Sequence, residues 1–187
     1  MVTLAAALIM GCGKEDVQVY KSPKAEAKPV AHGDAHGVDL QHGATHEHSP
    51  YDSDLPSGWV SQSASGMRLI SFKVPVGEAS LDGSVVQLNV AGGDVVSNVN
   101  RWRGQVALAP ADSKDIMAEM KEFDCGLGKF KYFKLINPEN PKSAILVSMI
   151  TVDQMVVFTK LMGPMEPLIA QEANFLAFCR SLRPHKH

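Results

Sequence analysis

Histidine, the side chain best suited to bind transition metals, is concentrated in two stretches of this 187-residue chain. Imidazole nitrogens bind zinc, copper and nickel, so a histidine-rich stretch can chelate any of these ions. The terminal residues His185 and His187 can add to such a site. Spacing in a flexible chain imposes no geometry, so we expect the binding to be weak and unselective; the alternative is a solvated low-complexity linker. We expect no other cofactor. The histidines of the first stretch are His32, His36, His42, His46 and His48.

A second candidate site lies in residues 98–105, which read Asn-Val-Asn-Arg-Trp-Arg-Gly-Gln. Helical spacing puts Val99, Trp102 and Val106 on one face, which we expect to dock on a sheet. The polar residues beside that face carry several fixed donors, which suit an anionic or amide-bearing ligand or a protein partner. The alternative is structural, because Asn caps helices and Arg binds loop carbonyls. These polar residues are Asn98, Asn100, Arg101, Arg103 and Gln105.

Cys125 and Cys179 are the two cysteines of the segment that we expect to fold, and residues 56–184 contain no histidine. An oxidising compartment favours a disulfide between the two cysteines, and two separate buried thiols are the alternative. Without a histidine, neither Ser-His nor Cys-His catalysis is available to this segment. We therefore expect no enzymatic activity.

Cys12 follows a hydrophobic run over residues 2–11 that is too short to span a bilayer, which takes about twenty residues. Such a run has the length of the apolar part of a signal peptide. The four residues Ile9, Met10, Gly11 and Cys12 resemble the bacterial lipobox, in which the thiol becomes the site of diacylglycerol attachment. We therefore expect residues 1–12 to be a lipoprotein signal peptide with a lipidated Cys12. The alternative is that residues 1–11 form a buried element of the domain.

Composition changes sharply near residue 55. Residues 13–55 hold four lysines against eight acidic residues, with almost no large apolar side chains. Such a segment buries too little surface to offset its conformational entropy, so we expect a disordered linker. Residues 56–184 have the composition of a single folded domain, and residues 185–187 form a tail. The net charge of −2 argues against a nucleic-acid partner.

Periodicity within residues 56–184 predicts two strands, over residues 67–75 and 84–91, joined by a turn at Asp82 and Gly83. A short helix capped by Ser97 or Asn98 follows. A second helix begins at the capping pattern of Asp112 to Asp115 and includes Met120 and Phe123. Three antiparallel strands (130–136, 144–152 and 155–161) and one helix from Gly163 to about residue 182 complete the order β-β-α-α-β-β-β-α. The prediction is an α+β domain with helices on a mainly antiparallel sheet.

Residues 56–182 resemble a family of uncharacterised exported bacterial proteins. The resembling segments are Met67-Arg68, residues 98–105, residues 158–164 (Phe-Thr-Lys-Leu-Met-Gly-Pro) and residues 175–182 (Phe-Leu-Ala-Phe-Cys-Arg-Ser-Leu). The order of elements is also similar to the PsbP-like α/β/α sandwich, whose members often serve as accessory subunits or binding modules. This resemblance implies the fold; no metal or partner site is carried over, because no matching motif is present.

Together these patterns predict a lipid-anchored protein of the cell envelope, facing the periplasm or the exterior. Its α+β domain is expected to bind an envelope protein or a small ligand without catalysis. The alternative is an envelope metal-binding protein that uses the histidine-rich linker for zinc, copper or nickel.

Overall fold

The computed structural model describes residues 49–186, which are built on a seven-stranded sheet. The strand order is β2-β3-β4-β8-β7-β6-β5, and every neighbouring pair is antiparallel. This architecture confirms the predicted α+β class. The elements are β1 (Tyr51–Asp52), β2 (Val60–Gln62), β3 (Arg68–Val76), β4 (Ala79–Asn89), the short 3-10 helix η1 (Val90–Gly92), α1 (Val95–Gln105), α2 (Ser113–Glu119), β5 (Lys121–Cys125), β6 (Gly128–Leu135), β7 (Ala144–Val152), β8 (Met155–Gly163), α3 (Met165–Ala170), α4 (Glu172–Ser181) and β9 (Arg183–Pro184).

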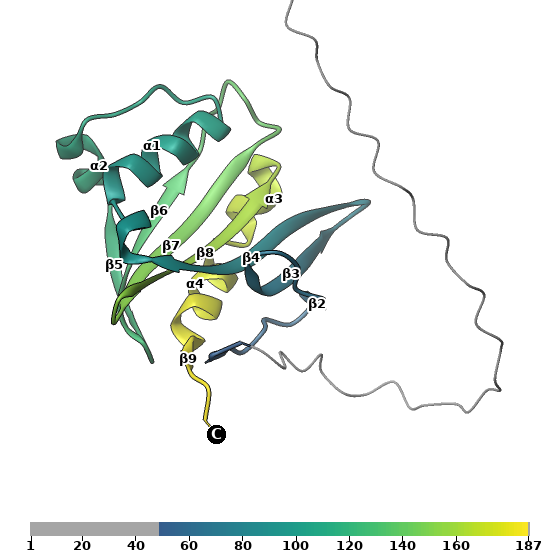
Figure 1. Ribbon diagram of the computed structural model, residues 1–187. Helices are drawn as coiled ribbons and strands as arrows, with labels where there is room; N and C mark the ends of the chain where they lie inside the picture. Colours follow the sequence, from purple (N-terminus) through teal and green to yellow (C-terminus); the bar gives the residue numbers. More distant parts are fainter. Residues whose placement is uncertain (1–48, 187) are drawn as a thin grey trace, which may run out of the picture. The chain divides into compact units, whose positions relative to one another are not determined.

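Helices cover both faces of the sheet, which gives three layers (Figure 1). The apolar cluster beneath α1 and α2 includes Val99, Trp102 and Ile116, packed on side chains from β6, β7 and β8. The cluster on the other face includes Phe175 and Phe178 of α4 and extends across the sheet to β3 and β4. The central strands β6, β7 and β8 therefore alternate between two cores, which explains the nearly continuous burial of β7.

The turn expected at Asp82 and Gly83 lies elsewhere. Both residues are inside β4, and the β3–β4 hairpin turns through Gly77 and Glu78, between the paired residues Val76 and Ala79. Gly77 has a φ of 61°, which glycine adopts without the penalty that a Cβ imposes. Gly83 is needed for packing instead, because a Cβ there would lie 1.9 Å from Cε2 of Phe72.

The second helix is shorter than expected, and its predicted last turn is a strand. Asp112 caps α2 as predicted, since its carboxylate accepts a hydrogen bond from the backbone N–H of Asp115. The helix ends at Glu119, and Phe123 belongs to β5. Pairing with β6 places the Phe123 ring 5.7 Å from that of Phe130, so cross-strand packing outweighs the local helical pattern.

Two further boundaries differ from the prediction. The cap of α1 is Asp94, whose carboxylate accepts a 2.7 Å hydrogen bond from the Ser97 N–H; neither Ser97 nor Asn98 is the cap. The predicted last helix is two helices, α3 and α4, which meet at Gln171. The Gln171 side chain accepts a hydrogen bond from Trp59 Nε1 at 3.0 Å and so ties the segment before β2 to this junction.

Both ends of the described region meet in a small two-stranded sheet. β1 pairs with β9, an ion pair joins Asp54 to Arg183, and Nδ1 of His185 lies 2.7 Å from a carboxylate oxygen of Asp52. The structured region therefore includes Tyr51 and Asp52 of β1, which lie inside the segment assigned to the linker. The predicted signal peptide, Cys12 and the five histidines from His32 to His48 lie outside the described residues.

Candidate functional site

The predicted polar residues of α1 are positioned by the burial of the opposite side of the helix. Val99 and Trp102 are buried against the sheet as expected, and the Trp102 ring meets Phe158 of β8 edge-on at 5.7 Å. These contacts fix the rotation of α1, so its polar residues lie along the flanks of the helix.

Asn98 is a buried structural link rather than an exposed contact. Its side-chain amide donates to the carbonyl oxygens of Gly92 (2.7 Å) and Asp94 (2.8 Å). Its carbonyl accepts a 2.6 Å hydrogen bond from Nη2 of Arg101. Asn98 thus joins η1 to α1 and orients Arg101.

Asn100 and Arg103 bind the loop that follows the helix. The Asn100 side chain accepts from the backbone N–H of Ala111 and donates to its carbonyl, at 2.9 and 3.0 Å. Arg103 donates to the carbonyl of Ala109 and pairs with Glu119 at 3.3 Å. Asn100 joins α1 to the loop before α2, and Arg103 joins α1 to that loop and to α2, which leaves fewer of their donors for a ligand.

Arg101 and Gln105 are the two members of the motif that face solvent. The Arg101 guanidinium lies 5.9 Å from the Trp102 ring centroid and keeps donors free beyond its hydrogen bond to Asn98. These two side chains are four residues apart and therefore share one flank of α1. The structure thus divides the motif into a supporting set and an accessible pair.

Beside that flank, a polar row crosses the sheet on the face that carries α1. Direct cross-strand partners point to the same face. The register pairs Ser71 with Ser84 and Ser84 with Lys160, while Lys73 pairs with Asp82. The apolar cluster under α1 and α2 includes no residue of β2 or β3, and Figure 1 shows this edge of the sheet projecting beyond both helices. Charged side chains therefore occupy an uncovered sheet face.

Asp82 is the centre of the ion pairs on this face. Its two carboxylate oxygens accept from both Nη atoms of Arg68, at 2.7 and 3.2 Å, and Lys73 Nζ lies 2.9 Å away. Arg68 also donates to Ser71. The hydrogen bond from Arg68 holds the pKa of Asp82 below its usual value, with a further contribution from Lys73. Asp82 is thus ionised and orients two cations.

Lys160 differs from the other cations because it is about half-buried and forms no ion pair with any described carboxylate. Burial lowers the pKa of its ammonium group, and the positive charges of Arg68 and Arg101 lower it further, while Asp82 partly opposes them. A half-buried cation without a counter-ion favours the approach of an anion. We call Arg68, Lys73, Lys160, Arg101 and Asp82 the basic face; its net charge is +3.

Sequence reasoning identified only Arg101 of the basic face. Strand alternation alone would have grouped Ser71 with Lys73 and Asp82 with Ser84. It would not have joined them to Lys160, which lies more than seventy residues later in the chain and reaches them through the β4–β8 pairing.

The turn at Gly92 and Gly93, which precedes α1, borders a hollow of about 140 Å³ that is also lined by Lys129, Lys131 and Thr151. Two features disfavour an anion there. Lys129 is paired with Asp124 at 3.0 Å, and the carboxylate of Asp94 occupies the helix N-terminus. The basic face is therefore the stronger candidate.

The two cysteines of the domain are free thiols in the structure, on neighbouring elements α4 and β5. Cys179 is buried and donates to Ser148 Oγ at 3.4 Å, and burial raises its pKa to about 12. Burial also raises the pKa of Cys125. Neither thiol has the lowered pKa of a nucleophile, and their pairing under oxidation stays a prediction.

Within residues 49–186 no group of three or more His, Cys, Asp or Glu side chains is arranged to hold a metal ion. In the same region no helix is long and apolar enough to cross a membrane.

Comparison with known proteins gives distant structural likenesses. No protein-family model matches the sequence, and no curated protein matches it. The chain is similar to cyanobacterial PsbP (CyanoP) from Synechocystis, with 15% identity, a TM-score of 0.46, and 82% of this chain and 98% of that chain covered. It is similar to LpqN of Mycobacterium tuberculosis, described as involved in cell envelope biogenesis, with 11% identity, a TM-score of 0.47, and coverage of 73% and 83%.

A protein of Bacteroides thetaiotaomicron is also similar, at 12% identity and a TM-score of 0.46. The alignment covers 74% of this chain but only 46% of the Bacteroides protein, so the chain spans less than half the length of that protein.

Proposed function

We propose that this protein is a lipid-anchored protein of the cell envelope whose domain binds an anionic group of a ligand or partner, without catalysis. The basic face is the binding site in this proposal. The observation that carries it is Lys160, a half-buried cation that has no ion pair among the described residues and is exposed to the positive charges of Arg68 and Arg101. A bound anion would supply the missing counter-charge.

The absence of catalysis is part of the proposal and rests on the side chains of the domain. Residues 56–184 contain no histidine to serve as a base near neutral pH. The two thiols have raised pKa values. The one carboxylate of the basic face, Asp82, is held by two cations and is a poor proton acceptor because its pKa is lowered.

The anchor in this proposal is Cys12, with residues 13–48 as the tether. Acyl chains contribute about 0.8 kcal/mol per buried methylene, so a lipidated Cys12 would hold the protein at a membrane. Palmitate labelling of the full chain, lost in Cys12→Ser, is the expected result. Labelling that persists in the variant would contradict the anchor and leave the binding face untouched.

Binding by the basic face is tested by calorimetric titration of the full-length Cys12→Ser protein with inorganic pyrophosphate and with an oligoglutamate peptide. We expect binding of at least one probe that weakens with added salt and is lost in Lys160→Met. The matched control, Lys129→Met, removes a charge at the other edge of the sheet and should bind as the parent does. Failure of both probes, or equal binding by both variants, would refute the proposed site.

A second candidate function rests on the five histidines of residues 32–48. We propose as the alternative that this segment binds zinc, copper or nickel in the envelope. Calorimetric titration with each metal, on the full chain and on a variant with these five histidines changed to alanine, separates the two functions. Metal binding at micromolar concentration that is absent from the variant would support the alternative.

A further inference from the structure

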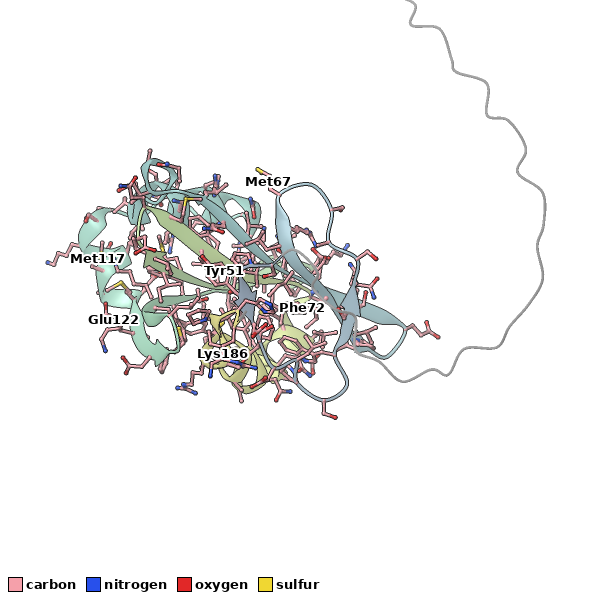
Figure 2. All side chains as sticks on the ribbon, turned by 60° about the horizontal axis from the view of Figure 1, so that its bottom comes forward. Tyr51, Met67, Phe72, Met117, Glu122 and Lys186 are labelled. Carbon is pink, nitrogen blue, oxygen red and sulfur yellow. The ribbon has the colours of Figure 1, made fainter. Side chains whose placement is uncertain are left out.

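The basic face is bordered by exposed apolar side chains. Met67, in the hairpin between β2 and β3, is 73% exposed and is adjacent in sequence to Arg68. Val60 of β2 is 48% exposed and pairs directly with Lys73, so both point to the same side of the sheet. Figure 2 shows Met67 projecting from the outside of the hairpin, whereas Phe72 of the same strand pair lies in the interior.

The charge of this edge becomes positive only where β8 and α1 join it, because the two cations of residues 60–89, Arg68 and Lys73, are balanced by two carboxylates. Residues 60–89 contain two carboxylates, Glu78 at the tip of the β3–β4 hairpin and Asp82, which is already paired with Arg68 and Lys73. Lys160 and Arg101 add two positive charges toward α1, so the edge carries a net charge of +2 with Glu78 included. The cations lie on β3, on β8 and on the flank of α1, and cations spread in this way suit a surface of many anions better than a single small ion.

Cations next to projecting apolar side chains are the combination by which proteins lie on anionic membranes. The cations are attracted to lipid phosphates, and the apolar side chains enter the boundary between headgroups and acyl chains. We infer that the basic face, together with Met67 and Val60, docks directly on the surface of an anionic bilayer. This inference rests on the proposed function, because it identifies the anion as the phosphate of lipid headgroups.

Direct docking gives the β2–β3 edge a role separate from the lipid anchor. An anchor at Cys12 limits the distance from the membrane but does not set the orientation of the domain. A second contact through the basic face would turn this edge toward the lipid and leave the opposite edge, β5, toward other envelope components.

The test is co-sedimentation of the full-length Cys12→Ser protein with vesicles of phosphatidylcholine alone or of phosphatidylcholine and phosphatidylglycerol in equal parts. The Cys12 substitution removes the proposed anchor, so any binding is due to the protein surface. We expect binding to the anionic vesicles only, and its loss at high salt. Equal binding to neutral vesicles, or none to anionic ones, would overturn the inference.

Substitutions test which surface of the domain binds the vesicles. Each basic residue near an anionic membrane contributes about fivefold to binding, so the double variant Lys73→Gln, Lys160→Gln should bind about thirtyfold more weakly. Met67→Ser with Val60→Ser should weaken binding without any change in charge. The control Lys121→Gln, Lys129→Gln makes the same charge change at the β5–β6 edge and should bind nearly as the parent does. Similar losses in both charge variants would overturn the docking surface.

Titration of the same protein with pyrophosphate and oligoglutamate distinguishes binding to lipid headgroups from binding to soluble anions. Binding of pyrophosphate or oligoglutamate without binding to anionic vesicles would overturn membrane docking but leave the proposed anion site in place. Failure with every probe would refute both.

Discussion

Asp82→Asn should make the domain less stable and its binding of anions stronger. The substitution keeps the size of the side chain and removes the charge that holds Arg68 and Lys73. The side chains of Asp82 and Arg68 are 29% and 34% exposed and that of Lys73 is 42% exposed, so solvent screens both pairs. Partly exposed pairs are worth about 0.2–1 kcal/mol each, with the bidentate Arg pair at the upper end. We therefore expect a loss of about 1–2 kcal/mol.

The stabilisation contributed by Asp82 should also depend on pH in a defined direction. The folded pKa of Asp82 is below its usual value, so its contribution to stability is complete above the unfolded pKa of about 4 and is lost as the pH falls through the folded pKa. The difference between parent and variant should thus be present at neutral pH and disappear in acid. Urea unfolding followed by tryptophan fluorescence should show a midpoint shift of about 0.5–1 M at pH 7.

Binding should change in the opposite direction. Removing Asp82 raises the charge of the basic face from +3 to +4, so affinity for anionic vesicles should increase about fivefold. Asp124→Asn is the matched control, because it removes an equal charge from an exposed pair on β5 and should change neither stability nor binding appreciably. A variant that is as stable as the parent at pH 7, or that binds more weakly, would refute this reasoning.

Three further results are expected. Lys160→Met should raise the free energy of unfolding by on the order of 1 kcal/mol while weakening anion binding, because it replaces a half-buried unpaired charge. Since burial lowers the pKa of Lys160, the parent protein should gain stability as the pH rises through that pKa. A variant that unfolds at lower urea concentration than the parent would instead show that Lys160 has a structural role. Gly83→Ala should cost about 3 kcal/mol or more in the same assay, because the new Cβ overlaps the Phe72 ring, and a loss below 1 kcal/mol would contradict this packing. Thiol modification of the folded protein should label Cys125 before the buried Cys179, and equally fast labelling of both would show that α4 opens readily.

Several elements of the fold followed from local sequence. The periodicity of residues 67–75 predicted β3, and two antiparallel strands were predicted over residues 144–152 and 155–161, where β7 and β8 form a hairpin. Asp112 was identified as the cap of α2. These features depend on residues that are close together in the chain, so their physical causes are visible in the sequence.

Other elements depended on distant partners. Phe123 follows a helical pattern, yet pairing with β6 and contact with Phe130 place it in a strand. Gly83 after Asp82 suggested a turn, although its cause is the Phe72 ring on the neighbouring strand. In both cases a contact across the sheet outweighed a local preference, and single-sequence patterns do not contain such contacts.

The candidate site also combines features set by local sequence with features set by distant partners. The sequence by itself determined that Asn98 to Gln105 would form a helix with polar flanks, because helical periodicity is local. Only the tertiary structure decided that Asn98, Asn100 and Arg103 support neighbouring loops while Arg101 joins Lys160, Arg68 and Asp82. The physical reason is strand order. The β4–β8 pairing brings charges from distant parts of the chain onto one face, and that order is set by packing of the whole sheet.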